Sequence, residues 1–119
     1  VNLFLEVLGK RPDGYHAVET LMVAVNLYDT LEATARPAGD ITLSCDPPEV
    51  PSGPRNLAHK AAAALRRAAA TAAGADLRLT KRIPHEAGLG GGSSDAATTL
   101  LVLNRLWGLN RSAAELRAV

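Results

Sequence analysis

A cluster of glycines between two differently patterned segments is the feature that most restricts how this chain can fold. Four glycines fall within residues 88–92, after a short alternating segment and before a helical stripe. Without Cβ atoms, the backbone there can take positive φ angles and approach a ligand closely. A helix that starts at such a loop offers free amides and the positive end of its dipole to an anion. The segment therefore predicts a strand, a phosphate-binding loop and a helix, and the competing interpretation is a flexible connection.

Two serines follow the glycines, and their hydroxyl groups have two open interpretations. Ser93 and Ser94 can bind a phosphate oxygen or a magnesium-bound water, or either can cap the following helix. Two familiar phosphate motifs do not fit. A Walker loop requires Gly-Lys before Ser or Thr, and the dinucleotide fingerprint that would start at Gly88 requires glycine where Ser93 stands.

The first half of the chain has the pattern of strands and turns. Apolar and β-branched residues predict four strands, at residues 1–8, 15–26, 29–35 and 41–45. The turn signal at 10–14 separates the first two, and Pro37-Ala38-Gly39-Asp40 predicts a hairpin between the last two. The prolines within residues 47–54 predict a surface loop.

The second half alternates helix and strand. A helical stripe begins at Asn56, and Gly74 is its predicted stop. Alternation over 77–81 predicts a short strand, and the stripe of 97–107 predicts a second helix closed by glycine. The spacing of Ser112-Ala113-Ala114-Glu115 is that of a capping box, which predicts a third helix start.

Composition excludes several classes of function. Thirteen Lys and Arg against twelve Asp and Glu leave a net charge of +1, which gives no field for attracting nucleic acid or an anionic membrane. The single Cys45 cannot form an internal disulfide, which fits a cytoplasmic protein. No apolar run approaches the roughly 20 residues of a membrane span. We expect one domain with a small-molecule partner and neither a nucleic-acid nor a membrane partner.

The segment 84–97, with the sequence Pro-x-x-x-Gly-Leu-Gly-Gly-Gly-Ser-Ser-Asp-Ala-Ala, resembles the second conserved motif of the GHMP kinases. The triple glycine and the preceding Lys81-Arg82-Ile83-Pro84 are similar to the branch of this superfamily that phosphorylates a cytidine diphosphate ester of methylerythritol. Four other segments are also similar to that branch: Val1-Asn2-Leu3-Phe4-Leu5, Arg11-Pro12-Asp13-Gly14-Tyr15-His16, Arg55-Asn56-Leu57 and Asn104-Arg105-Leu106-Trp107.

The resemblance implies an α+β fold, a two-layer α/β sandwich of the ribosomal-protein S5 domain 2 type. Residues 1–119 would form the amino-terminal GHMP domain, truncated at both ends and without the carboxy-terminal domain. The implied reaction transfers the γ-phosphoryl group of ATP, with Mg²⁺, to the 2-hydroxyl of the substrate in non-mevalonate isoprenoid biosynthesis. Another GHMP kinase of the homoserine or mevalonate type is an alternative, against which Asp13-Gly14-Tyr15-His16 argues. A non-catalytic anion-binding domain is a second alternative.

The resemblance also implies roles for single residues. Asn2 and His16 would contact the cytidyl substrate, and Tyr15 would stack on the cytosine ring. The catalytic Lys would precede Val1 and the catalytic Asp would lie beyond Val119, so these residues alone would be inactive. The implied ATP-binding residues are Asn56, Lys81, Pro84, Ala87, Gly88, Leu89, Gly90, Gly91, Gly92, Ser93 and Ser94.

Most of these residues also have ordinary structural interpretations. Tyr15 and His16 would be exposed residues after a turn, and Asn56 would be a helix N-cap. Lys81 would be a solvated strand end.

Two acidic residues are also well placed. Asp29 is expected to be a turn residue, and Asp95 is expected to be a first-turn carboxylate favoured by the helix dipole. His59 and His85 receive no functional role.

Overall fold

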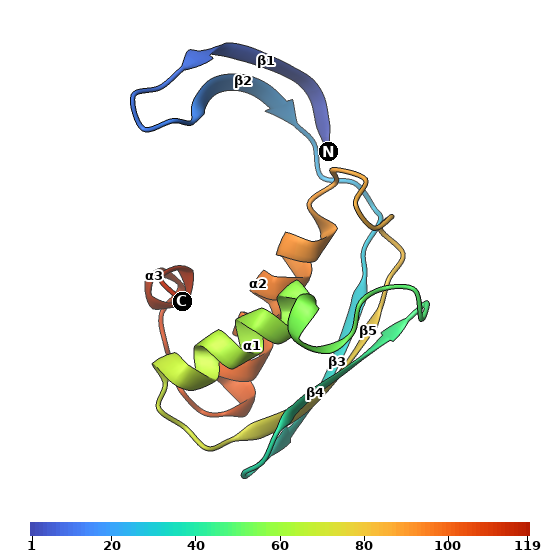
Figure 1. Cartoon of the computed structure of the whole chain (residues 1–119), viewed down its shortest axis with the longest axis vertical. Coiled ribbons are helices and arrows are strands. Elements are labelled where there is room, and N and C mark those ends of the chain that lie inside the picture. Colours follow the sequence, from blue (N-terminus) through green and yellow to red (C-terminus); the bar gives the residue numbers. More distant parts are fainter.

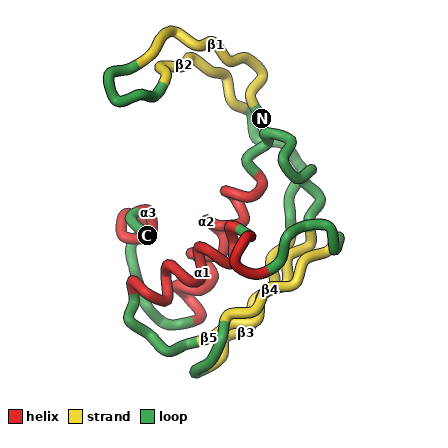
Figure 2. The backbone as a smooth tube through the Cα atoms, in the orientation of Figure 1, coloured by secondary structure: helices red, strands yellow, loops and turns green.

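The computed structural model describes all residues, 1–119, and contains a hairpin, a three-stranded sheet and helices on one face of that sheet (Figures 1 and 2). The strands are β1 (Asn2–Lys10), β2 (His16–Met22), β3 (Thr30–Arg36), β4 (Ile41–Asp46) and β5 (Gly74–Thr80). The helices are the 3-10 turn η1 (Gly53–Arg55), α1 (Leu57–Ala68), α2 (Gly91–Leu106) and α3 (Ala113–Arg117). Helices on one side of a sheet give the two-layer α/β arrangement that was expected.

The three-stranded sheet has the order β3-β5-β4, so the predicted hairpin between β3 and β4 is wrong. β5 lies between them, antiparallel to β3 and parallel to β4. A parallel pair needs a crossover connection, and α1 provides it between β4 and β5. The connection at residues 37–40 reverses the chain direction but leaves the width of one strand between β3 and β4.

Gly74 begins β5 and does not end α1, which corrects a second expectation. The helix already ends at Ala68, and Ala70 takes a positive φ of 49° just beyond it. A Cβ on Gly74 would lie 2.7 Å from the carbonyl oxygen of Asp40. Glycine is therefore required at this position because the β3–β4 connection passes directly over the start of β5.

Helix α1 forms where the sequence predicted it, because its cap and its apolar stripe agree. Asn56 is the N-cap, and its side-chain oxygen accepts a hydrogen bond from the amide of Ala58 at 2.9 Å. Ala58, Ala62 and Leu65 are fully buried and share one face at helical spacing. This face packs on α2 and on the sheet.

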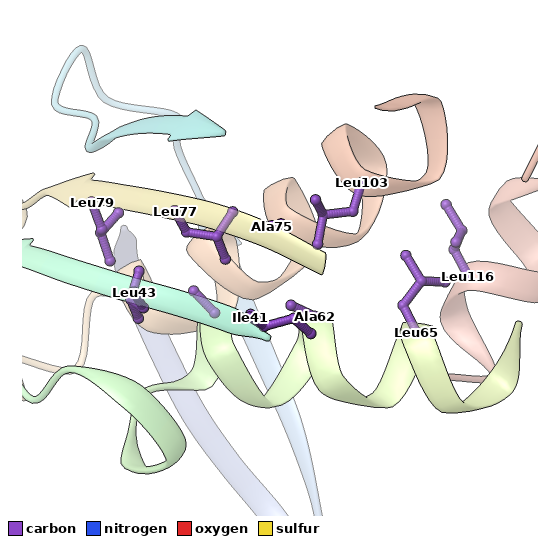
Figure 3. Packing of buried hydrophobic residues seen from close by; sticks show 10 residues of the cluster. Ile41, Leu43, Ala62, Leu65, Ala75, Leu77, Leu79, Leu103 and Leu116 are labelled. Carbon is purple, nitrogen blue, oxygen red and sulfur yellow. The ribbon is translucent and has the colours of Figure 1, made fainter. Parts of the chain in front are cut away.

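The core lies between the sheet and the helices (Figure 3). Alternate residues of β4 and β5 point toward α1 and α2, as their period of two requires. Leu65, Leu79 and Leu103 are the largest apolar side chains that are completely enclosed. The cluster consists of Ile41, Leu43, Ala58, Ala62, Leu65, Ala75, Leu77, Leu79, Leu103 and Leu116.

Polar contacts hold the end of α2 and the start of α3. The indole nitrogen of Trp107 donates to the carbonyl of Gly74 at 3.1 Å. The Asn104 side chain donates to the Arg111 carbonyl and accepts from the Arg111 amide, both at 3.0 Å. The predicted capping box is confirmed, because Ser112 and Glu115 exchange side-chain and backbone hydrogen bonds at the start of α3.

The β1–β2 hairpin stands away from the layered part of the molecule, as Figure 1 shows. The two strands are antiparallel, and every residue of β1 is exposed. The predicted turn is confirmed: the Arg11 amide donates to the Tyr15 carbonyl at 2.6 Å, and Gly14 has a φ of 87°. The second strand ends at Met22, earlier than expected.

Candidate functional site

The glycine segment forms an exposed loop that leads directly into α2. Gly90 is the N-cap and has a left-handed conformation, with φ 72° and ψ 10°. The first bond inside the helix is donated by the Ser94 amide to the Gly90 carbonyl at 3.0 Å. The amides of Gly91, Gly92 and Ser93 precede this bond, so they lack an acceptor within the helix and are available to an anion.

The helix begins inside the glycine run, at Gly91, rather than after the serines. Ser93 and Ser94 therefore belong to the first turn, and neither caps the helix, which has Gly90 at its N-cap without a side-chain cap. Both serines are exposed. Of the two interpretations of their hydroxyl groups, capping of α2 is excluded, and ligand binding stays a prediction.

Two of the glycines permit close packing at the base of the loop. A Cβ on Gly91 would lie 2.9 Å from Cγ2 of Ile83 and 3.1 Å from Nζ of Lys81. A Cβ on Gly92 would lie 3.3 Å from Cδ1 of Leu57. The start of α2 thus rests directly on the end of β5 and on the start of α1.

A small pocket of about 90 Å³ lies at this junction. It brings Asn56 and Lys81, two predicted ATP-binding residues, together with the base of the glycine loop. Asn56 is held by three hydrogen bonds, because its amide nitrogen also donates to the Pro51 carbonyl at 2.8 Å and to Sγ of Cys45 at 3.6 Å. The pocket is lined by Val50, Pro51, Arg55, Asn56, Leu57, Lys81, His85, Gly92 and Asp95.

Lys81 is not a solvated strand end but the centre of a buried ion cluster. Its ammonium group binds the carboxylate of Asp29 and lies 2.8 Å from the carboxylate of Asp95. The three side chains are exposed by only 6%, 4% and 8%, in the order Lys81, Asp29 and Asp95. The expectations for Asp29 as a turn residue and for Asp95 as a dipole-favoured carboxylate both missed this shared partner.

Asp29 also holds the backbone that leads toward the glycine loop. Its second carboxylate oxygen accepts from the amide of Arg82 at 2.6 Å and from the amide of Ile83 at 2.9 Å. Asp29 immediately precedes β3 and Lys81 immediately follows β5, its antiparallel neighbour. The pairing of these two strands was the one signal that could have predicted the contact.

The two carboxylates have pKa values displaced in opposite directions. Burial alone would raise the pKa of Asp29, but hydrogen bonds from Lys81 and from two backbone amides outweigh it and lower this pKa. Burial raises the pKa of Asp95, while Lys81 opposes the rise. Burial works against the ammonium of Lys81, but its two carboxylate partners raise its pKa. The ionised form is therefore stabilised more strongly in Asp29 than in Asp95, because only Asp29 also accepts hydrogen bonds from backbone amides.

The predicted substrate-binding residues all lie on the hairpin. Tyr15 directly precedes β2 and is 74% exposed, and its neighbour His16 is the first residue of that strand. Asn2 begins β1 at the opposite, open end, where it pairs with Met22. At about 3.3 Å per residue, the two ends of such a strand pair lie roughly 25 Å apart along the strands. The structure brings Tyr15 and His16 together but leaves Asn2 apart from them.

Four other hollows are larger, and two of them show a chemistry that differs from that of the loop. One of about 410 Å³ lies over the sheet and is lined mainly by polar side chains of β3, β4 and β5, among them Glu32, Asp76 and Arg78. Another of about 520 Å³ is mostly apolar and lies between α2 and α3. None of the four includes a residue of the loop from Pro84 to Gly92, and the apolar one reaches only Ser93 of the first turn of α2. We therefore assign the candidate site to the smaller pocket beside the glycines.

No helix in the structure has both the length and the apolarity needed to cross a membrane. No group of three or more His, Cys, Asp or Glu side chains is arranged to hold a metal ion.

The glycine loop at the start of α2 and the two-layer fold agree with a known family. The family model described as "GHMP kinases N terminal domain" matches residues 56–119, from the N-cap of α1 to the end of the chain. This match covers more than half of the sequence. The chain belongs to the GHMP kinases and contains residues of their amino-terminal domain.

Relatives with a more specific name are similar over nearly the whole chain. The 4-diphosphocytidyl-2-C-methyl-D-erythritol kinase of Synechococcus sp. (strain JA-2-3B'a(2-13)) is 48% identical over 119 residues, which are 100% of this chain and 38% of that protein. The kinase of the same name from Pelotomaculum thermopropionicum is 50% identical over 116 residues, which are 98% of this chain and 40% of that protein.

A solved structure gives the same result. The crystal structure of 4-(cytidine 5'-diphospho)-2C-methyl-D-erythritol kinase aligns with a TM-score of 0.79 and 41% identity, over 98% of this chain and 41% of that chain. The expected fold class is confirmed by this match. The chain thus spans about two fifths of the length of the relatives that it matches.

Proposed function

We propose that the full-length protein is a 4-diphosphocytidyl-2-C-methyl-D-erythritol kinase, which transfers the γ-phosphoryl group of ATP to the 2-hydroxyl of that substrate. This reaction is a step of non-mevalonate isoprenoid biosynthesis, and we propose a cytoplasmic enzyme. The observation that carries the proposal is the left-handed Gly90, which starts α2 so that the amides of Gly91, Gly92 and Ser93 face no acceptor in the helix. The names of relatives at 48% and 50% identity support the choice of substrate.

The ATP phosphates would lie over the glycine loop. Phosphoryl transfer depends mainly on positioning and on neutralising oxygen charge, and backbone amides supply both without a covalent step. The exposed loop from Pro84 through Ala87, Gly88 and Leu89 would close around the phosphates, and the hydroxyl groups of Ser93 or Ser94 would add donors. The pocket lined by Asn56 and Lys81 would hold the nucleoside beside the loop.

The cytidyl substrate would bind against the hairpin. The ring of Tyr15 is exposed and therefore free to stack on cytosine, and His16 is next to it on the chain. Base stacking on an aromatic side chain contributes on the order of 1–3 kcal/mol. Asn2, at the other end of β1, would contact a different part of an extended substrate.

Mg²⁺ would enter this site with the ATP phosphates rather than through a protein cage. The chain offers no cluster of three metal-ligating side chains, and the Asp95 carboxylate in α2 is already paired with Lys81. Mg²⁺ is commonly held by substrate phosphates, waters and one or two protein oxygens, so the hydroxyl groups of Ser93 and Ser94 fit it. The ion would neutralise phosphate charge. The catalytic Lys and Asp expected from the family would lie before Val1 and beyond Val119.

A phosphorylation assay of the full-length protein tests this proposal. ATP and Mg²⁺ are supplied with the cytidyl-erythritol substrate, with homoserine or with mevalonate, and ADP release is measured. We expect a clear preference for the cytidyl-erythritol substrate. A preference for homoserine or mevalonate would assign the protein to another branch of the GHMP kinases.

A non-catalytic anion-binding domain is the second candidate, since the anion loop alone explains binding without transfer. Calorimetric titration of the full-length protein with ADP separates the two. ADP binding without phosphorylation of any GHMP substrate would favour the binding domain.

A further inference from the structure

The ion cluster of Asp29, Lys81 and Asp95 connects three separate elements at the base of the glycine loop. Asp29 lies just before β3, Lys81 just after β5, and Asp95 in α2. The Lys81 amide also donates to the Asp46 carbonyl at 2.8 Å, which fixes the end of β5 on β4. The ammonium group therefore extends from a backbone that is already anchored.

Burial makes this cluster sensitive to the loss of any member. Charged groups are costly to bury unless each is paired and hydrogen-bonded. Here every buried side-chain nitrogen and oxygen has a partner. The cluster holds two carboxylates and one ammonium, so removing Lys81 would leave two buried anions without a cation. Removing either carboxylate would delete one of the two links that Lys81 makes, so the three side chains act as a unit.

The start of α2 packs on this unit. The site of a Cβ on Gly91 would be 3.1 Å from the Lys81 ammonium, so the first residue of the helix lies directly against the charged group. Asp95, four residues further on, binds the same ammonium. Two successive turns of α2 are thereby fixed against the end of β5, and the free amides of residues 91–93 lie between them.

We propose that Asp29, Lys81 and Asp95 form a positioning triad that fixes the amino-terminal turn of α2, so that Lys81 supports nucleotide binding by orienting loop amides rather than by donating to the nucleotide. This inference rests on the proposed function for its ligand. It differs from the direct nucleoside contact that the family resemblance implies, because two of the three N–H groups of the ammonium already donate to carboxylates. Lys81 still lines the pocket, but its charge pairs with Asp29 and Asp95 and so holds α2 against the end of β5.

Asp29→Asn in the full-length protein separates the two roles. Asp29 is not among the residues that line the pocket, so it has no contact to lose with a nucleoside. The positioning role predicts that the ADP dissociation constant rises about tenfold, the scale of one charge-assisted hydrogen bond. A direct role of Lys81 predicts unchanged or tighter binding, because the substitution releases the ammonium. That result would overturn the proposal.

A readout without nucleotide keeps this test independent of the proposed function. The Ser94 amide makes the first hydrogen bond of α2, so its hydrogen exchange reports whether the first turn is formed. We expect faster exchange of this amide in nucleotide-free Asp29→Asn than in wild type. Wild-type exchange in the variant would overturn the triad, whereas a wild-type protein that binds no ADP would overturn only the proposed function.

Matched variants control for folding. Asp76→Asn removes an ion pair with Arg36 in the same sheet and should leave both ADP affinity and Ser94 exchange unchanged. If Asp29→Asn does not fold, Asp95→Asn keeps the balanced Lys81–Asp29 pair and removes only the charged link to α2. Faster Ser94 exchange in that variant supports the triad, and exchange equal to wild type refutes it.

Discussion

The two glycines that flank α2 allow backbone strain to be separated from ligand binding. Gly90 precedes the helix with φ 72°, and Gly108 follows it with φ 63°. A Cβ at either position would meet no atom within 4 Å. Alanine at either site therefore destabilises the folded state for the same reason, because a residue with a side chain must adopt a left-handed conformation.

The expected cost to folding is similar in both variants. An L-residue in the left-handed region costs roughly 1–2 kcal/mol, so Gly90→Ala and Gly108→Ala should each lower the free energy of unfolding by about that amount. Only Gly90 lies at the loop where the phosphates would bind. A new Cβ there would enter the space that the ligand needs, and a larger, β-branched side chain in Gly90→Val should abolish binding.

Urea unfolding and calorimetric titration with ADP give the comparison. We expect equal losses of stability but weakened ADP binding in Gly90→Ala alone. Equal ADP affinity in the two folded variants would show that the glycine loop only connects β5 to α2. The phosphate-binding interpretation would then be withdrawn.

Four further outcomes follow from the site and the core. Tyr15→Ala should raise the KM for the cytidyl substrate more than the KM for ATP, and equal changes would refute the stacking role. Ser93→Ala should weaken ATP binding by about 1–2 kcal/mol in calorimetry, and no change would exclude a phosphate contact. Leu65→Ala should cost about 2–5 kcal/mol of stability in urea unfolding without changing ADP affinity, because Leu65 is fully buried in the core. The pKa of Asp29 is below its ordinary value of 3.8, so the stability that Asp29 adds is present above pH 3.8 and is lost as pH falls through the folded-state pKa. The stability gap between wild type and Asp29→Asn should therefore narrow in acid unfolding, and a gap that widens there would contradict this sign.

Local sequence signals predicted most of the elements but not the order of the strands. Asn56 and the capping box at Ser112 are local, and both helix starts form as expected. The connection at residues 37–40 carries the composition of a hairpin, yet β5 separates the two strands that it joins. Turn chemistry determines where the chain reverses, whereas the partner of a strand depends on which face must be buried, and β5 has the most buried side chains.

The same difference between local and long-range signals applies to the candidate site. The conformation of the glycine loop was predictable because it depends on consecutive residues, and Gly90 and the free amides form within that segment. The triad could not be predicted from the sequence, because Asp29 is separated from Lys81 by 52 positions and contacts it only when β3 pairs with β5. Each of its charges, viewed alone in the sequence, is typical of an exposed residue.

The triad also explains why a loop rich in glycine can still have a defined position. Gly90 and its neighbours lack the side chains that usually hold a loop, and residues 87–90 are all exposed. The position of the loop is therefore fixed by contacts at its base. There Asp29 binds the amides of Arg82 and Ile83, and Lys81 binds Asp95. An anion site made of backbone amides requires an exposed loop with a fixed base, because the amides must stay uncovered while the backbone that carries them is held in place.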